Sequence, residues 1–169
     1  MPLSSIIPIL LLAAASASDP KAPESFTVEF ETDVPGKMTL NITRKSAPFG
    51  VDRFYALVKD NFFNQAAFFR VVPSFVVQFG IAGTPSENMK WDQIIPDDPV
   101  IESNVEGTLT FATAGPDTRT TQLFINLKGK IFLLLNICVF SILLIIFLTQ
   151  LLLKYLFNYQ IIFLSQYLY

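Results

Sequence analysis

The chain has 169 residues, enough for one domain of ordinary size, and 51% of them are hydrophobic. A formal net charge of −2 gives no electrostatic footprint for nucleic acid, so no nucleic-acid partner is expected. There is no histidine and only one cysteine, which excludes histidine-based catalysis, an internal disulfide and a Cys/His zinc site. We therefore expect neither a metal nor a cofactor.

The N-terminus has the pattern of a secretory signal peptide over residues 1–17. Residues 6–15 form an apolar core too short to span a bilayer, and Ala15-Ser16-Ala17 supplies the small residues of a cleavage site. The alternative is a disordered apolar N-terminus. Residues 18–24, with two prolines, read as a linker, and the whole pattern predicts entry into the secretory pathway, either the endoplasmic reticulum lumen or secretion.

Two segments with alternating apolar residues predict a β-hairpin with one buried face. The first runs from Ser25 to Thr32 and the second includes Met38, Leu40 and Ile42, with a turn at residues 34–37 between them. Asn41 begins an N-x-Thr glycosylation sequon on the outward phase of the second strand. It is a candidate glycosylation site if the chain is secreted.

A helix is predicted to follow the hairpin. Ser46 is the expected N-cap and Pro48 falls in the first turn. An apolar stripe typical of a core-facing helix comes next, formed by Val51, Phe54 and Val58. The helix is expected to end near Asp60-Asn61.

Further short strands and one long loop are predicted after this early helix. The strands are expected at residues 67–71, 75–79, 108–113 and 122–127, and residues 84–98 read as an irregular loop anchored by Trp91. From residue 128 the composition changes. Residues 131–153 are 23 uncharged residues, a candidate transmembrane helix and hence a possible membrane association.

Three polar side chains interrupt the apolar strands, where a buried strand normally carries none. Arg70 and Gln78 lie in one run and Gln122 in another. A few hydrogen-bonding groups on a hydrophobic surface are typical of a pocket for a small ligand or peptide. For Arg70 alone, a structural ion pair is the alternative.

At these residues the sequence resembles the cyclophilins, a family of peptidyl-prolyl cis-trans isomerases. The pattern F-x-R-V-x-P-x-F-x-x-Q-x-G is met by Phe68, Arg70, Val71, Pro73, Phe75, Gln78 and Gly80. The pattern G-x-L-x-x-A-x-A-G-P-x-T-x-x-x-Q-x-F-I is met by Gly107, Leu109, Ala112, Ala114, Gly115, Pro116, Thr118, Gln122, Phe124 and Ile125. The resemblance covers residues 25–127.

The resemblance implies roles for eight residues of a site. Arg70 would be the catalytic residue, while the substrate-binding set would be Phe75, Val76, Gln78, Ala112, Thr113, Gln122 and Phe124. Phe75 and Phe124 would line the proline-ring pocket, and Gln78 and Gln122 would bond the substrate backbone. Val76 stands where the family often has Met, and Thr113 where many members have Asn.

The resemblance also implies a mainly β, cyclophilin-like barrel that is incomplete. The family's last strands and second helix have no counterpart in residues 128–169, so the strand from Ser25 to Thr32 is expected to be an open edge, with an apolar C-terminal helix added. The tail is either a membrane anchor or translated non-coding sequence from a mispredicted gene. The second interpretation is favoured because the break falls after Leu127, inside the domain.

The predicted function is peptidyl-prolyl cis-trans isomerisation in protein folding, with proline-containing peptides or unfolded proteins as partners. The implied open edge and the missing last strands and second helix leave an alternative from another class. In that alternative the chain is a catalytically weak proline-peptide binder or a membrane-tethered, chaperone-like module.

Overall fold

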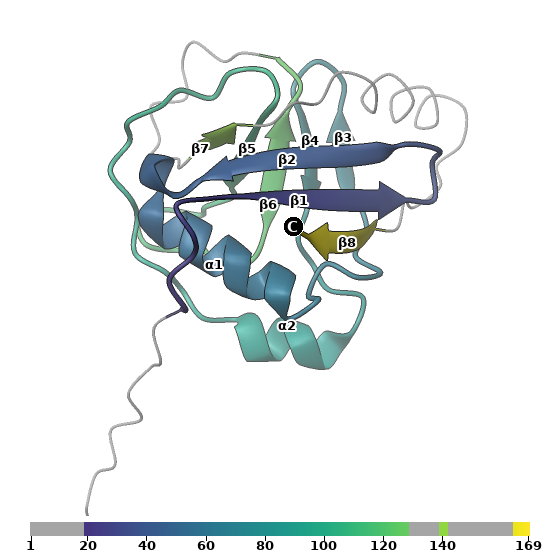
Figure 1. Ribbon diagram of the computed structural model, residues 1–169, viewed down its shortest axis with the longest axis horizontal. Coiled ribbons are helices and arrows are strands. Elements are labelled where there is room, and N and C mark those ends of the chain that lie inside the picture. The colour runs from purple at the N-terminus through teal and green to yellow at the C-terminus, as the bar shows by residue number, and fades with distance from the viewer. Residues whose placement is uncertain (1–18, 129–138, 142–163) are drawn as a thin grey trace, which may run out of the picture.

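The computed structural model describes residues 19–128, 139–141 and 164–169, and the elements follow one another as Figure 1 shows. In chain order they are β1 (Ser25–Thr32), β2 (Lys37–Thr43), a 3-10 turn (Arg44–Ser46), α1 (Pro48–Lys59), β3 (Arg70–Val72), β4 (Val76–Phe79), α2 (Pro85–Trp91), β5 (Thr108–Phe111), β6 (Leu123–Asn126), β7 (Val139–Ser141) and β8 (Leu164–Leu168). The fold is mainly β, as predicted. The predicted signal peptide lies outside the described residues.

The strands form two antiparallel sheets, one ordered β2-β1-β8 and the other β3-β4-β6-β5-β7. In Figure 1 the strands β1 and β2 run across the strands of the second sheet, with α1 beside them. Among the described strands no ladder joins the two sheets. An incomplete cyclophilin-like barrel was predicted, and the described strands form two sheets on a shared core and no closed barrel.

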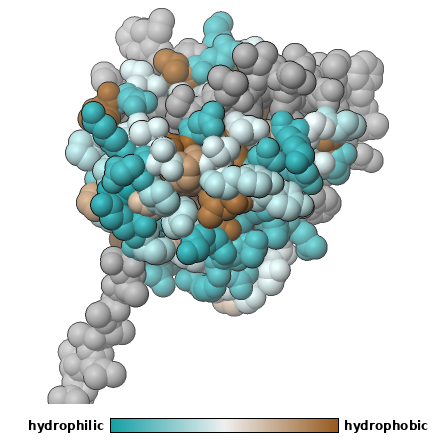
Figure 2. Space-filling view, viewed as in Figure 1, coloured by the Kyte–Doolittle hydropathy of each residue, from teal (hydrophilic) through white to brown (hydrophobic). Residues whose placement is uncertain are grey.

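The predicted hairpin is confirmed, and its inward face builds much of that core. β1 and β2 pair from Ser25↔Thr43 to Glu31↔Lys37, and Val28, Phe30 and Leu40 are fully buried. The Phe30 ring contacts Phe79 of the other sheet at 5.8 Å between centroids. The surface over this part of the molecule is mostly hydrophilic, with a smaller hydrophobic area near its centre (Figure 2). Period-two alternation thus decides which side of the hairpin packs inward.

Helix α1 forms where the sequence predicts it, but its N-terminus is capped differently. The stripe Val51, Phe54 and Val58 is buried. Ser46 is not the N-cap, because its hydroxyl donates to Glu102 Oε1 at 2.6 Å. The residue at the cap is Ala47, whose side chain makes no capping bond. The first-turn N–H groups need acceptors. The carboxylate of Asp98, from a distant loop, supplies them.

The segment predicted as an irregular loop contains a second helix, α2. Pro85 in its first turn fits a helix start, and Asn88 bonds the backbone of Ala82 through both amide atoms at 2.8 and 2.9 Å. Trp91 does anchor the segment, since its Nε1 donates to Asp60 Oδ2 at 2.7 Å. The prediction missed the helix because seven residues are too few to show a helical period.

The predicted open edge of β1 is wrong, because β8 covers it. The pairing runs from Val28↔Leu168 to Thr32↔Leu164, and Thr27 and Tyr169 exchange two further backbone bonds of 3.2 and 2.9 Å. The last residues of the chain thus occupy the position next to the first strand.

The apolar C-terminal helix is not found among the described elements of the tail. Within residues 131–153 the described part is β7, a strand that pairs with β5, and residues 164–168 form β8. In the part of the chain that the structure describes, no helix has the length and apolar character needed to cross a bilayer. The rest of the transmembrane candidate lies outside that part.

Candidate functional site

Arg70, Gln78 and Phe124 lie in one row across three neighbouring strands. Arg70 on β3 is opposite Gln78 on β4, and Gln78 is opposite Phe124 on β6. Side chains of directly opposed residues project from the same face of a sheet. The arginine and the phenylalanine that the sequence analysis assigned to one pocket are therefore on one face, two strands apart.

Hydrogen bonds connect the polar members of this row to Gln122. Arg70 Nη1 donates to Gln78 Oε1 at 3.4 Å, and Gln78 Nε2 donates to Gln122 Oε1 at 3.0 Å. Gln122 precedes Phe124 by two residues. The structure thus brings a guanidinium, two amides and an aromatic ring together as a polar–apolar strip, which we call the Arg70 row.

The alternation of the strands explains why the Arg70 row faces outward. The residues in the opposite phase are fully or almost fully buried and belong to the core: Val77, Phe79, Leu109, Phe111, Leu123 and Ile125. In the row, Arg70 is exposed, while Gln78, Gln122 and Phe124 are half-buried. Such a surface can hold an apolar group against Phe124 while donors approach from its rim.

Val76 and Phe75 occupy different places relative to this row. Val76 is in the same phase as Gln78, two residues away, and it is buried. Phe75 precedes β4 at the turn after Ser74, which has a φ of 57°, and it is half-buried. The strand register places Val76 on the row's face but does not place Phe75 in the row.

Ala112 and Thr113 border the row at the end of β5. The Ala112 N–H donates to the Gln122 carbonyl at 2.9 Å, so this segment runs beside Gln122. The Thr113 hydroxyl accepts a bond from the Gly115 N–H at 3.1 Å and lies 2.9 Å from Thr118 Oγ1. These contacts keep the Thr113 hydroxyl within its own loop. The expected contact of Thr113 with a substrate would therefore be made by its backbone groups and not by its hydroxyl.

Some residues around the site were not singled out from the sequence. Thr110 lies beside the row, opposite Phe124 on β5, and its buried hydroxyl donates to Asn104 Oδ1 at 2.7 Å. Arg119 and Asp98, in the loops that precede β6 and β5, are fully or almost fully buried. The sequence carries little signal for them, because threonine is common in strands and charged loop residues are usually exposed.

Within the residues that the structure describes, no group of three or more His, Cys, Asp or Glu is arranged to hold a metal ion. The Arg70 row itself contains one permanently charged group and otherwise amides and a ring. Such a site can bind, orient and donate hydrogen bonds, but the row offers no nucleophile.

The comparisons with known proteins decide the family. The model for the family described as cyclophilin type peptidyl-prolyl cis-trans isomerase/CLD matches residues 27–145. The chain belongs to the cyclophilin family. The matched range includes all of the Arg70 row, so the row lies within the cyclophilin domain of this chain.

Relatives of this cyclophilin share about a third of its aligned residues. A peptidyl-prolyl cis-trans isomerase of Schizosaccharomyces pombe is 34% identical over 106 residues, covering 59% of this chain and 66% of the relative. One from Acinetobacter baylyi is 33% identical over 108 residues, covering 63% of this chain and 57% of the relative. The chain thus spans less than two thirds of the length of these two curated relatives.

A solved structure supports the fold of this cyclophilin. The crystal structure of a cyclophilin type peptidyl-prolyl cis-trans isomerase from Cryptosporidium parvum aligns with a TM-score of 0.64. The alignment covers 86% of this chain and 98% of that one, at 18% sequence identity. At this identity the likeness concerns the fold.

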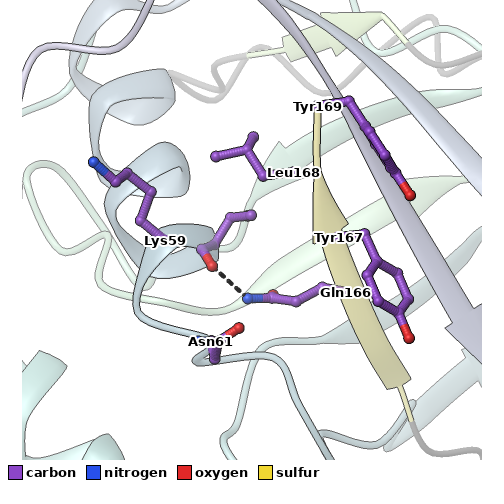
Figure 3. A pocket seen from close by; sticks show the side chains of 7 residues that line it. Lys59, Asn61, Gln166, Tyr167, Leu168 and Tyr169 are labelled. Carbon is purple, nitrogen blue, oxygen red and sulfur yellow. Dashed lines mark hydrogen bonds between the residues drawn. The ribbon is translucent and has the colours of Figure 1, made fainter.

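A cavity of about 370 Å³ lies elsewhere on the cyclophilin fold, between the end of α1 and β8 (Figure 3). It is lined by Val58, Lys59, Asn61, Gln166, Tyr167, Leu168 and Tyr169. Gln166 Nε2 donates to the Val58 carbonyl at 2.6 Å, while Gln166 Oε1 is buried without a hydrogen-bond partner. No residue of the Arg70 row lines this cavity, and a single water molecule would satisfy the amide oxygen.

Proposed function

We propose that this cyclophilin accelerates cis–trans isomerisation of X-Pro bonds in proline-containing peptides and unfolded proteins. The uncatalysed step has a barrier of about 18–20 kcal/mol, which comes from amide resonance, and takes tens to hundreds of seconds. No covalent intermediate is needed. A catalyst has to hold the proline ring and stabilise an amide that is twisted out of conjugation.

The single observation that carries the proposal is the register that aligns Arg70, Gln78 and Phe124. In the twisted amide the prolyl nitrogen regains its lone pair and can accept a hydrogen bond. A donor aimed at that nitrogen binds the transition state more tightly than either ground state. Arg70 fits this role, because its guanidinium keeps its charge when partly desolvated. A proline ring held against Phe124 would bring the amide within reach of the arginine.

Gln78 and Gln122 support the same assignment. Their mutual bond of 3.0 Å orients both amides along the row, which leaves further donor and acceptor positions for the backbone of a bound peptide. The Ala112 and Thr113 segment would form the rim on the other side of that peptide.

The experiment compares turnover and binding in matched variants. A protease-coupled assay on a proline-containing peptide is expected to show turnover, with kcat/KM lowered about 10²–10³-fold by Arg70→Ala, as for loss of one transition-state donor. Binding of the same peptide should weaken far less. Lys45→Ala, which removes an exposed cation from the 3-10 turn, is the control and should leave kcat/KM within about twofold.

A second candidate function is a proline-peptide binder with little turnover. The observation that favours it is the hydroxyl of Thr113, whose bonds lie within its own loop. Specific binding to Phe124 without measurable turnover in the unmutated chain would support this candidate and refute the isomerase. Absence of both activities would refute both.

We also propose that the chain enters the secretory pathway and carries a glycan on Asn41. Asn41 is exposed on β2 and its Oδ1 accepts a bond from Thr27 Oγ1 at 3.1 Å. The support is the sequon together with the apolar N-terminus. After expression in a secreting eukaryotic cell, glycosidase treatment should lower the apparent mass. Thr43→Ser keeps the sequon and should keep this shift, and Thr43→Ala should abolish it.

Membrane association through residues 131–153 is a further proposal, which rests on the uncharged sequence alone. The strand pairing of Val139–Ser141 argues against one continuous helix through this segment. Extraction of the expressed protein at alkaline pH tests it: release into the soluble fraction would refute an integral anchor.

A further inference from the structure

Arg119 is fully buried among acidic groups. Its Nη1 and Nη2 both donate to Asp98 Oδ2 at 3.2 Å, and its Nε lies 3.0 Å from Asp97 Oδ1 as an ion pair without hydrogen-bond geometry. The Pro96 carbonyl accepts a further bond from Nη2. Removing a guanidinium from water is costly, and a buried ion pair is weak evidence for added stability. A role in fixing geometry is the better explanation for it.

The ion pairs join two loops that are also held together through their backbones. Asp97 N–H donates to Asp117 Oδ1 at 2.7 Å, and Asp117 N–H donates back to Asp97 Oδ2 at 3.0 Å. The Ile95 N–H donates to the Arg119 carbonyl at 2.9 Å. The loop that carries Arg119 is therefore fastened at both its backbone and its side chains.

Asp98 extends this connection to helix α1. Its carboxylate accepts the N–H groups of Phe49 at 2.7 Å and Gly50 at 2.9 Å, so it caps the helix that Ser46 was expected to cap. A Cβ on Gly50 would lie 3.1 Å from Arg119 Nη1, which shows how closely the guanidinium packs against the helix. Through Asp98 and α1, the loop that carries Arg119 is therefore fixed against the core of the protein.

The same loop leads directly into the Arg70 row. Thr121 Oγ1 donates to the Gly80 carbonyl at 2.9 Å, which ties the loop to the end of β4. The next residue, Gln122, accepts from Ala112 N–H with its backbone and from Gln78 with its side chain. The position of Gln122 is therefore fixed by these bonds at the point where the Arg119 loop joins β6.

We propose that Arg119 is a positioning residue for Gln122, beside the rim formed by Ala112 and Thr113. This inference rests on the proposed isomerase function for its kinetic consequences. Only arginine meets the geometry, because its planar fork reaches Asp97, Asp98 and the Pro96 carbonyl at once, whereas a lysine ammonium on a flexible stem cannot span all three.

The test uses Arg119→Lys beside the matched control Arg44→Lys. Arg44 also takes part in an ion pair, donating from Nε at 2.8 Å and Nη2 at 2.7 Å to Asp52, which lies on α1 and not in the Arg119 loop. Both variants keep the charge and lose the fork. At a temperature well below both unfolding midpoints, Arg119→Lys should lower kcat/KM about tenfold, since small misplacements of site groups are costly. Arg44→Lys should change it less than about twofold.

A double variant separates positioning from general structural damage. In the Gln122→Ala background, Arg119→Lys should cause little further loss of kcat/KM, because the group that it positions is gone. A full additional tenfold loss would show that Arg119 does not act through Gln122 and would overturn the inference. An equal effect of Arg119→Lys and Arg44→Lys in the unmutated background would do the same.

Backbone amide hydrogen exchange gives a readout that does not depend on turnover. The Ala112 and Gly115 amides are hydrogen-bonded around Gln122 and within the loop, so Arg119→Lys should speed their exchange, and Arg44→Lys should not. If the unmutated chain neither binds nor isomerises the peptide, the proposed function fails. The exchange result then still decides the inference: faster exchange in Arg119→Lys alone supports it, and unchanged exchange refutes it.

Discussion

Replacing Asp98 with alanine should destabilise the fold through two separate losses. The carboxylate caps α1 by accepting from Phe49 and Gly50, and it pairs with the guanidinium of Arg119, whose side chain is 0% exposed. Loss of a helix cap costs about 1 kcal/mol. Leaving one partner of a buried ion pair behind costs about 3–5 kcal/mol. Because Asp97 still lies 3.0 Å from the guanidinium, the lower value applies.

The expected result is a fall of about 4 kcal/mol in the free energy of unfolding for Asp98→Ala, as the sum of these two terms. Asp98→Asn keeps one acceptor for the helix and should lose about 2 kcal/mol. Urea unfolding measures both, with exposed Asp92→Ala as the control, expected within about 0.5 kcal/mol of the unmutated chain.

A double-mutant cycle with Arg119→Met completes the design. Once the guanidinium is absent, Asp98→Ala no longer leaves it unpaired. The double variant should therefore lose about 2 kcal/mol less unfolding free energy than the sum of the two single variants. Simple additivity, or an Asp98→Ala variant as stable as Asp92→Ala, would refute the argument that the carboxylate holds a buried charge.

Three further predictions concern other parts of the fold. Gln166→Ala removes the bond to a late carbonyl of α1 and should lower the unfolding free energy by about 1 kcal/mol, measured in urea. Gly80→Ala should cost at least about 2 kcal/mol and reduce turnover, because φ is 104° and the new Cβ would lie 2.4 Å from the Thr121 carbonyl oxygen; unfolding and peptide assays on one sample check both. Burial raises the pKa of Asp52, but the hydrogen bonds from the Arg44 guanidinium and a backbone N–H lower it by a larger amount. The pKa of Asp52 therefore lies below its ordinary 3.8. That pairing therefore stabilises the fold above about pH 4 and is lost as pH falls through the folded-state value, so Asp52→Asn should show a shallower loss of stability in an acid titration.

The parts of the fold that follow from local patterns were predictable. The alternation of β1 and β2 gave the hairpin and its buried face, and the spacing of Val51, Phe54 and Val58 gave α1. The polar residues inside apolar strands marked the Arg70 row, because a strand that buries both faces has no place for a guanidinium.

The parts that depend on distant partners were not predictable from local patterns. Ser46 is a good N-cap residue by type, yet Asp98, 48 residues after Gly50, takes that role with a charged acceptor. A carboxylate bonds helix N–H groups more strongly than a hydroxyl does, and the positive end of the helix favours its charge. Nothing near residue 46 in the sequence reports this competitor.

The prediction of an open edge at β1 was wrong for a similar reason. The hydrophobic composition of the tail favours a helix and gives no sign of the strand in its last residues. Leu164–Leu168 pairs with β1, and Gln166 reaches the end of α1. Strand pairing requires backbone groups and a compatible register, so composition alone does not decide it.

The sheet order places the Arg70 row and the C-terminal strand β8 in different sheets. The Arg70 row needs only β3, β4 and β6, which pair directly with one another, while β8 belongs to the other sheet. A change at Gln166 should therefore act on the folded fraction of the protein and leave kcat/KM per folded molecule unchanged. A change at Gly80, which lies against the backbone of Gln122 and the start of β6, should instead lower both the stability and kcat/KM per folded molecule. The value of kcat/KM per folded molecule should therefore distinguish the two residues, because the two sheets share a core but no ladder among the described strands.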